Sequence, residues 1–242
     1  MEAGVGPPEP LGPVSVFLPV YNEEAILIKN TDTLRRFLET LNVSYEIIIG
    51  SNGSSDGTCR LGEELQRRNP HVRFFHLPES GPGAALKAAI DLMRYEAVVC
   101  LDMDLSSDLR FVTESLKLLA THDIVLGSKK MGTESRSLLR RAGSDVFIAC
   151  SRWLLGLPFD DYSIGAKTYR KTVLQRYRHA IDRGTAYVQW IVYLAYRDHL
   201  KITEVPLSCE DFRASRFNLI REGSYRFSHL FELWWSSRFS QR

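Results

Sequence analysis

Short apolar runs alternate with amphipathic stretches through the first half of the chain, and this alternation limits the possible folds more than any other feature. The apolar runs have the length of buried strands, and the stretches between them place apolar residues at helical spacing. Strands are expected at 14–19, 45–49, 72–77, 97–101 and 124–126, and helices at 22–41, from a turn at 51–58 through 69, at 83–94 and at 109–120. Successive strand–helix units predict a single α/β domain with a mostly parallel sheet and right-handed crossovers.

Length and charge bound the organisation of the chain. Residues 1–13 are rich in Pro and Gly and are expected to be disordered. The rest of the 242 residues suits one large domain, and the net charge of +2 gives no general argument for nucleic acid. Residues 128–183 hold 12 Lys and Arg against 5 Asp and Glu. Such a segment suits a polyanionic ligand or an acidic membrane surface, although a solvated basic face would have the same composition.

The four cysteines argue against a zinc ribbon and against a disulfide scaffold. Cys59, Cys100, Cys150 and Cys209 are far apart and form no Cys-x-x-Cys motif, which fits a reducing cytosol. The amino terminus has no signal-peptide pattern, and no apolar run approaches the roughly 18 residues of a membrane span. We therefore expect a cytoplasmic protein that meets a membrane only peripherally, at its cytosolic face.

Two carboxylates, Asp102 and Asp104, follow the apolar run that ends at Leu101. Open α/β sheets bind ligands at the carboxyl ends of their strands. If both residues continued the strand, their side chains would point the same way and would repel each other without a cation between them. Mg²⁺ and Mn²⁺ prefer oxygen ligands, and Mg²⁺ commonly joins carboxylates to substrate phosphates. The motif predicts a metal–diphosphate site, and the structural alternative is an acidic turn that caps the next helix.

Other expected strand ends also carry residues suited to ligand binding. They are the segments 19–24, 51–58 and 81–85, which are rich in Asn, Asp, Ser, Gly or Glu. Turn formation and helix capping would explain each segment alone. Together they converge on one edge of the sheet, which capping does not require. Gly81 and Gly83 would let the backbone approach a phosphate, but they complete neither a dinucleotide fingerprint nor a Walker loop.

An ordered set of motifs resembles glycosyltransferase family 2, and within it the dolichyl-phosphate mannose synthases and glucosyltransferases. The matching segments are 15–24, 52–58, 102–106, 127–129, 140–144, 161–167, 204–206 and 213–216. The resemblance implies a GT-A fold over residues 14–216, with a nucleotide-binding half at 14–127 and an acceptor half at 128–216. It also implies inverting transfer of a hexose from a nucleotide diphosphate sugar, GDP-mannose or UDP-glucose, with a divalent metal.

The same resemblance implies roles for individual residues. The nucleotide-sugar site would use Pro19, Tyr21, Glu23, Gly50, Asn52, Asp102, Met103, Asp104, Lys129, Arg213 and Arg216. Asp104 and Ser106 would hold the metal, with Asp102 as a further ligand. The metal and the cations would stabilise charge on the departing nucleotide diphosphate.

The chain departs from the family pattern at several of these positions. Ser51 and Asn52 stand where the family usually has two Asp, which puts the preferred base in doubt because an amide both donates and accepts. Lys129 replaces an Arg and keeps the charge without the bidentate fork. Trp190 falls where an acidic residue is expected 14 positions before Glu204. These changes affect the choice of donor and acceptor more than the reaction class.

The acceptor can be argued from chemistry. A sugar hydroxyl needs a positioned base, for which Asp161 is the best candidate, whereas a lipid phosphate needs only cations to place it. The candidate acceptor cations are Arg136, Arg140, Arg141, Arg152 and Lys167. An amphipathic stretch at 146–155 accompanies them, although it would also suit an ordinary helix on the sheet. We therefore favour a polyprenyl or dolichyl phosphate acceptor.

The carboxyl-terminal segment, residues 217–242, is expected to form an amphipathic helix. Phe227, Leu230, Phe231 and Trp234 follow helical spacing, so this helix would lie on a membrane, bind a membrane partner subunit or pack in the core. Two further functions stay open. One is transfer to a glycan or protein hydroxyl, and the other is a non-catalytic subunit that binds nucleotide sugars.

Overall fold

The computed structural model describes residues 11–129, 131, 138–162, 165–208 and 219–239. The strands are β1 (Val14–Val20), β2 (Tyr45–Asn52), β3 (Val72–Leu77), β4 (Ala97–Cys100), β5 (Ile124–Ser128), β6 (Lys167–Arg170) and β7 (Ile202–Pro206). The α-helices are α1 (Leu27–Thr40), α2 (Thr58–Arg68), α3 (Pro82–Ala89), α4 (Arg110–Leu118), α5 (Leu138–Leu155), α6 (Lys171–Arg176), α7 (Tyr187–Arg197) and α8 (Leu219–Phe239). A 3₁₀ turn, Arg178–Ala180, follows α6.

The strands form one mixed sheet in the order β3-β2-β1-β4-β6-β5-β7. β6 pairs antiparallel with both β4 and β5, and the other neighbouring strands are parallel, which confirms the prediction of a mostly parallel α/β sheet. The sequence did not predict β6, because Lys167–Arg170 is short and carries polar residues in place of an apolar run. β6 lies between the last two strands of the expected nucleotide-binding half, so both halves build the same sheet.

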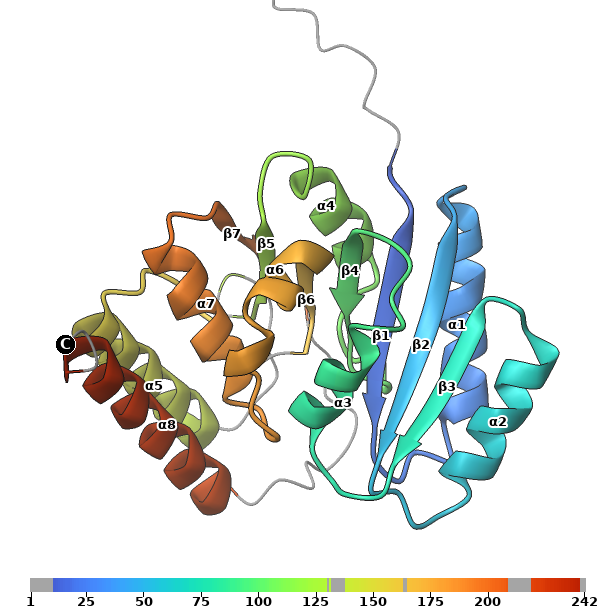
Figure 1. Cartoon of the computed structure of the whole chain (residues 1–242), viewed down its shortest axis with the longest axis horizontal. Coiled ribbons are helices and arrows are strands. Elements are labelled where there is room, and N and C mark those ends of the chain that lie inside the picture. The colour runs from blue at the N-terminus through green and yellow to red at the C-terminus, as the bar shows by residue number, and fades with distance from the viewer. Residues whose placement is uncertain (1–10, 130, 132–137, 163–164, 209–218, 240–242) are drawn as a thin grey trace, which may run out of the picture.

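Helices cover both faces of the sheet (Figure 1), and alternate strand residues face the two layers. In β1, Val16 and Leu18 join the apolar cluster beneath α1, α2 and α4. Phe17, between them, joins the other cluster, which is covered by α3, α5, α7 and α8. Each face therefore has its own hydrophobic core, and the loops at the strand ends are left to carry polar chemistry.

The first helix begins later than its apolar pattern predicts. It starts at Leu27, whereas the sequence predicts a helix from Asn22. Asn22 has a left-handed backbone with φ of 54°, and the carbonyl of Glu23 accepts hydrogen bonds from the N–H groups of Ile26 and Leu27. A turn therefore occupies 22–26, because polar contacts of this segment to the next strand end replace helical bonds. The third helix also ends early, at Ala89 rather than Arg94.

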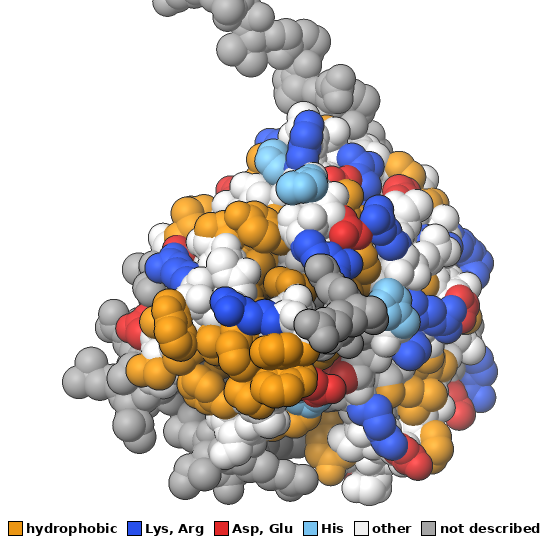
Figure 2. Space-filling model, turned by 60° about the vertical axis from the view of Figure 1, so that its left-hand side comes forward, with side chains coloured by type: hydrophobic (Ala, Val, Ile, Leu, Met, Phe, Trp, Pro, Cys, Tyr) orange, Lys and Arg blue, Asp and Glu red, His pale blue; other side chains and the backbone are white. Residues whose placement is uncertain are grey.

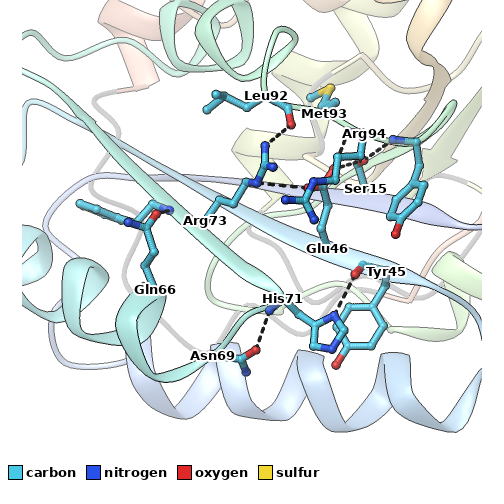
Figure 3. Close-up of polar contacts among 12 residues, drawn as sticks. Ser15, Tyr45, Glu46, Gln66, Asn69, His71, Arg73, Leu92, Met93 and Arg94 are labelled. Carbon is cyan, nitrogen blue, oxygen red and sulfur yellow. Dashed lines mark hydrogen bonds and ion pairs between the residues drawn. The ribbon is translucent and has the colours of Figure 1, made fainter.

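A polar network lies at the amino ends of the strands, opposite the strand ends that carry the two aspartates (Figure 3). The Glu46 carboxylate is 2% exposed and accepts hydrogen bonds from Ser15 Oγ at 2.7 Å and from the Arg94 backbone N–H at 2.6 Å. The Nε atoms of Arg73 and Arg94 lie 3.6 and 3.8 Å from its Oε2. Arg73 also donates to the Leu92 carbonyl. These bonds fix the connection from α3 to β4, the strand that leads to the two aspartates.

α5 and α8 lie side by side at the end of the molecule away from β3 (Figure 1). Leu230 and Leu233 of α8 are buried, and Phe227 meets Phe147 of α5 edge to face at 5.4 Å. The other side of the pair exposes aromatic rings, including Trp153, which is 84% exposed. Among the described residues, no helix combines the length and the apolar character needed to cross a membrane.

Candidate functional site

The two aspartates lie in a tight turn directly after β4. Because β4 ends at Cys100, they do not continue the strand, and the alternation of a strand cannot set their directions. Instead the Leu105 N–H donates to the Asp102 carbonyl at 3.1 Å, with Leu105 in a left-handed conformation at φ of 50°. The Ser106 N–H donates to Asp104 Oδ1 at 3.1 Å. The turn thus places both carboxylates at the carboxyl end of the sheet, as the sequence predicts.

A residue of α1, which the sequence reasoning missed, anchors this turn. Asn30 Nδ2 donates to the Met103 carbonyl at 2.9 Å. Met103 lies between the two aspartates in sequence, and its side chain is buried in the core. Apolar anchoring on one side and a hydrogen bond on the other hold the backbone of the turn. No local sequence signal marks Asn30, because its partner lies 73 positions away.

The surroundings of Asp102 combine burial with like charge. Burial raises the pKa of Asp102, and the neighbouring Asp104 raises it further, while Lys129, Lys167 and a hydrogen bond from the Gly165 backbone lower it. A Cβ on Gly165 would lie 2.3 Å from Asp102 Oδ1, so only glycine allows this approach. The carboxylate is therefore held in a site where a cation would stabilise its charged form.

Lys167 lies in the interior, beside the aspartates. It is 1% exposed at the start of β6, where it pairs in register with Cys100 of β4. Burial lowers the pKa of Lys167 to about 8, although the charges of Asp161 and Asp102 raise it. The Lys167 ammonium group thus interacts electrostatically with the buried carboxylates of Asp161 and Asp102. Its predicted contact with an acceptor phosphate stays a prediction.

Asp161 is buried next to Lys129. Its Oδ2 accepts a hydrogen bond from the Lys129 backbone N–H at 3.3 Å, which joins the end of β5 to the 160–161 loop. The Glu204 carboxylate of β7 accepts from the backbone N–H groups of Asp160 at 2.9 Å and Asp161 at 3.1 Å. Burial raises the pKa of Glu204, while these two hydrogen bonds lower it. Glu204 therefore fixes the loop that carries Asp161.

The predicted base and ribose residues gather at the ends of β1 and β2. Pro19 and Gly50 are register partners, and a Cβ on Gly50 would lie 2.6 Å from the Phe75 ring. Tyr21 is 47% exposed and available to a ligand. The Glu23 N–H donates to Thr58 Oγ1 at 2.9 Å, which ties the turn after β1 to α2.

The Asn52 side-chain amide forms hydrogen bonds with the backbone around it. Its Nδ2 donates to the Val20 carbonyl at 2.9 Å, and its Oδ1 accepts from the Gly81 N–H at 2.9 Å. The side chain is buried, and it joins the ends of β1 and β2 to the loop that precedes α3. Its predicted contact with a nucleotide base stays a prediction.

Several predicted residues cannot be placed. Arg136, Arg213 and Arg216 lie outside the described residues. The backbones of Arg140 and Arg141 belong to the first turn of α5, but their side chains are not described. Trp190, at the position of the expected acid, packs against the core beneath α7.

The donor set at the turn fits a divalent metal with few protein ligands. No group of three or more His, Cys, Asp and Glu gathers within the described part of the chain. The two carboxylates of Asp102 and Asp104 lie close enough for the charge of Asp104 to raise the pKa of Asp102. Mg²⁺ and Mn²⁺ accept such a sparse oxygen set when phosphates and water supply the remaining ligands. Ser106 shows only its backbone bond to Asp104, so its role as a ligand stays a prediction.

The fold is that of the GT-A glycosyltransferases. Solved structures of glucosyl-3-phosphoglycerate synthase from Mycobacterium tuberculosis share it, including one with Mn²⁺, uridine-diphosphate-glucose and phosphoglyceric acid. That structure matches with a TM-score of 0.65 at 19% identity, over 91% of this chain and 79% of the other. The model of glycosyl transferase family 2 matches residues 15–223. The chain therefore belongs to glycosyl transferase family 2.

Two curated relatives add detail. The chain is 26% identical over 233 residues to glycosyltransferase AglD of Haloferax volcanii, covering 92% of this chain and 37% of the relative. It is 27% identical over 203 residues to the undecaprenyl-phosphate 4-deoxy-4-formamido-L-arabinose transferase of Pseudomonas fluorescens, covering 83% of this chain and 58% of the relative. The chain thus spans well under two thirds of the length of both relatives.

Proposed function

We propose that the protein is an inverting glycosyltransferase that moves a hexose from a nucleotide diphosphate sugar to a polyprenyl phosphate. The observation that carries this proposal is the turn after β4, where Asp102 and Asp104 lie together beside the buried charges of Lys167 and Asp161. This arrangement suits the polyanionic diphosphate of a donor. Membership in family 2 and the name of the undecaprenyl-phosphate relative support it. The donor candidates remain GDP-mannose and UDP-glucose.

A divalent metal, Mg²⁺ or Mn²⁺, would be held by Asp104 and Asp102. When bound, it would stabilise negative charge on the diphosphate leaving group. Other residues of the chain hold the two aspartates in position. Asn30 and the buried Met103 fix the turn, and Gly165, which has no side chain, allows Asp102 to lie close to its backbone. Lys129 lies 8% exposed at the end of β5, where its charge acts on Asp102. The Lys129 ammonium group would help to balance the negative charge of the donor.

The burial of Asp161 favours a phosphate acceptor over a hydroxyl. A hydroxyl needs a base that it can reach, within about 3 Å of the proton to be removed. Asp161 is 5% exposed, and its Oδ2 accepts a hydrogen bond from the Lys129 backbone. An anionic phosphate needs no base. In this proposal Asp161 balances Lys167 and positions the site, and transfer to a hydroxyl is the alternative.

The exposed aromatic surface of α5 and α8 suggests where the protein meets a membrane. This surface consists of Trp153, Phe227, Phe231, Trp235 and Phe239. Hydrophobic side chains gather on this side of the molecule, with Lys and Arg near them (Figure 2). Arg238 lies over the Trp234 ring at 5.5 Å. Aromatic rings with nearby cations suit the interface of an anionic bilayer, where the polyprenyl acceptor would reside.

Point substitutions test this membrane surface, because deletion of α8 would expose the core around Leu230 and Leu233. Trp153→Ser with Trp235→Ser should reduce flotation with phosphatidylglycerol vesicles and leave the melting temperature almost unchanged. Ile28→Ser, at an exposed apolar position of α1, is the matched control. Unchanged flotation of the double variant would exclude the bilayer and favour a partner subunit.

A transfer assay tests the reaction. The full chain is incubated with a panel of UDP- and GDP-sugars, Mg²⁺ or Mn²⁺, and a short polyprenyl phosphate. Metal-dependent transfer from one donor would support the proposal and identify the sugar. Donor hydrolysis without transfer to the lipid would instead favour a hydroxyl acceptor, and donor binding without hydrolysis or transfer would favour the non-catalytic subunit. Failure to bind any nucleotide sugar would contradict all three functions.

A further inference from the structure

A narrow hollow lies between α5, α7 and α8. It is lined by Phe147, Tyr162, Thr185, Ala186, Gln189 and Arg226. Tyr162 directly follows Asp161 in sequence, and the charge of Arg226 acts on Lys167 of the buried cluster. Arg226 comes from α8, a segment that the sequence reasoning connected only with membranes or partners. The hollow therefore brings a cation from the far end of the chain to the edge of the site.

The electrostatic surroundings of the hollow favour an anion. The charge of Arg226 acts on Lys167, whose pKa it lowers, so the guanidinium lies within electrostatic reach of the buried cluster. Thr185 and Ala186 directly precede α7, which begins at Tyr187. The Asp182 carboxylate accepts hydrogen bonds from the backbone N–H groups of Tyr187 and Gly184, both at 2.7 Å, so it already balances this end of the helix. Among the described residues of the lining, Arg226 therefore supplies the cationic group for an anion.

Phe147, Tyr162 and Ala186 supply the apolar part of the lining. The Phe147 ring meets Phe227 at 5.4 Å. Beyond Phe227, α8 carries the exposed rings of Phe231 and Trp235. The face of the molecule that bears these helices shows grouped hydrophobic side chains (Figure 2). A ligand with an anionic head at Arg226 would have apolar rings of α5 and α8 near it for an apolar tail.

We propose that Arg226 binds the phosphate group of the acceptor at the open side of this hollow and thereby selects phosphomonoesters over neutral acceptors. The inference rests on the proposed function and names a residue and a subsite for it. The planar guanidinium matches phosphate oxygens with two parallel hydrogen bonds, which a lysine cannot reproduce. Thr185 and Gln189 add polar groups to the same wall. The phosphate of a lipid and that of a small soluble phosphomonoester share this chemistry.

Steady-state transfer kinetics of the full chain test the assignment, with farnesyl phosphate and 3-phosphoglycerate as alternative acceptors. Arg226→Gln should raise the KM for the phosphorylated acceptor about tenfold or more and leave the KM for the donor within twofold. Arg226→Lys keeps the charge without the fork, so its acceptor KM should lie between the wild-type and Gln values. Arg197→Gln, at an exposed arginine of α7 paired with Asp198, is the matched control and should leave both KM values unchanged.

The outcomes separate this inference from the proposed function. If the wild-type protein glycosylates neither acceptor, the phosphate-acceptor proposal and this inference both fail. If it glycosylates one of them and Arg226→Gln leaves the acceptor KM unchanged, only the role of Arg226 is overturned. If transfer goes to 3-phosphoglycerate alone with the expected dependence on Arg226, the subsite stands and the lipid acceptor is excluded. If Arg226→Gln fails to fold, Arg226→Lys gives the same comparison of acceptor and donor KM.

Discussion

Two clusters of charged residues lie at opposite ends of the strands, and they differ in how their charges are balanced. The amino ends of the strands are called the amino edge of the sheet, and the carboxyl ends are called the carboxyl edge. At the amino ends of the strands, the Glu46 carboxylate lies between Arg73 and Arg94 and accepts two hydrogen bonds (Figure 3). At the carboxyl ends, Asp102 and Asp104 lie close to each other. The first cluster pairs one buried carboxylate with two arginines, whereas the second places two carboxylates together beside Lys129 and Lys167. This difference supports the proposal that the first serves stability and the second serves a ligand.

The largest expected effect is a loss of the sugar-transfer rate when one carboxylate is removed at the carboxyl edge. Asp104→Asn should lower kcat at least about a hundredfold, because it removes a carboxylate that would hold the metal. It should leave the melting temperature unchanged or higher, because the variant relieves repulsion with Asp102. Asp108→Asn, whose carboxylate pairs with Arg110 outside the site, is the matched control. A large loss of stability with unchanged kcat would reverse the roles of the two edges.

The second effect is on stability, at the amino edge. Glu46→Ala should cost about 3 kcal/mol of the free energy of unfolding, because it leaves two arginines and a buried Ser15 without their shared partner. Urea denaturation measures it, with Glu39→Ala, at an exposed pair with Arg35, as the matched control. The KM for the donor should not change at temperatures well below melting. A donor KM that rises while stability holds would contradict a purely structural role.

The Lys167 ammonium group gives the carboxyl ends of the strands a pH dependence. The pKa of Lys167 is about 8 in the folded protein, below the 10.5 usual for a lysine, with burial as the largest cause. Between these values the unfolded chain binds more protons, so stability should rise with pH from about 8 to 10.5 and be lost as pH falls through 8. Lys167→Met should remove this rise. Urea denaturation across that range, with a chelator present, measures the difference.

The contrast between the two edges also explains what the sequence could predict. The strand–helix alternation and the Asp102–Asp104 motif are local, so the sheet and the position of the acidic turn follow from neighbouring residues. The partners of that turn are distant: Asn30, Gly165 and Lys167 come from three separate segments. β6 is too short and polar to be recognised as a strand, although it carries Lys167 into the site. Long-range packing, which no local pattern records, determines these contacts.

The same limit applies to α8. Its helical spacing was visible in the sequence, but spacing alone cannot separate a face that packs on α5 from a face that is exposed. The structure divides them: Leu230 and Leu233 are buried, whereas Phe231 and Trp235 are exposed. Arg226, on the same helix, lines the hollow with Tyr162. Only the packing of α8 against α5 reveals that one helix contributes to the core and to the surface and also lines this hollow.

The smallest expected effect comes from removing one of the two arginines at the amino edge. The Arg94 side chain is 58% exposed and its Nε lies 3.8 Å from Glu46 Oε2, so solvent screens the pair. Arg94→Gln keeps the backbone N–H that donates to Glu46, and it should cost only about 0.5 kcal/mol of the free energy of unfolding. Arg73→Gln should cost more, because Arg73 is less exposed and also donates to the Leu92 carbonyl. Urea denaturation of both variants ranks them. Equal losses would mean that charge alone stabilises this edge, whereas the expected order would show that its hydrogen bonds, fixed by the backbone, do most of the balancing.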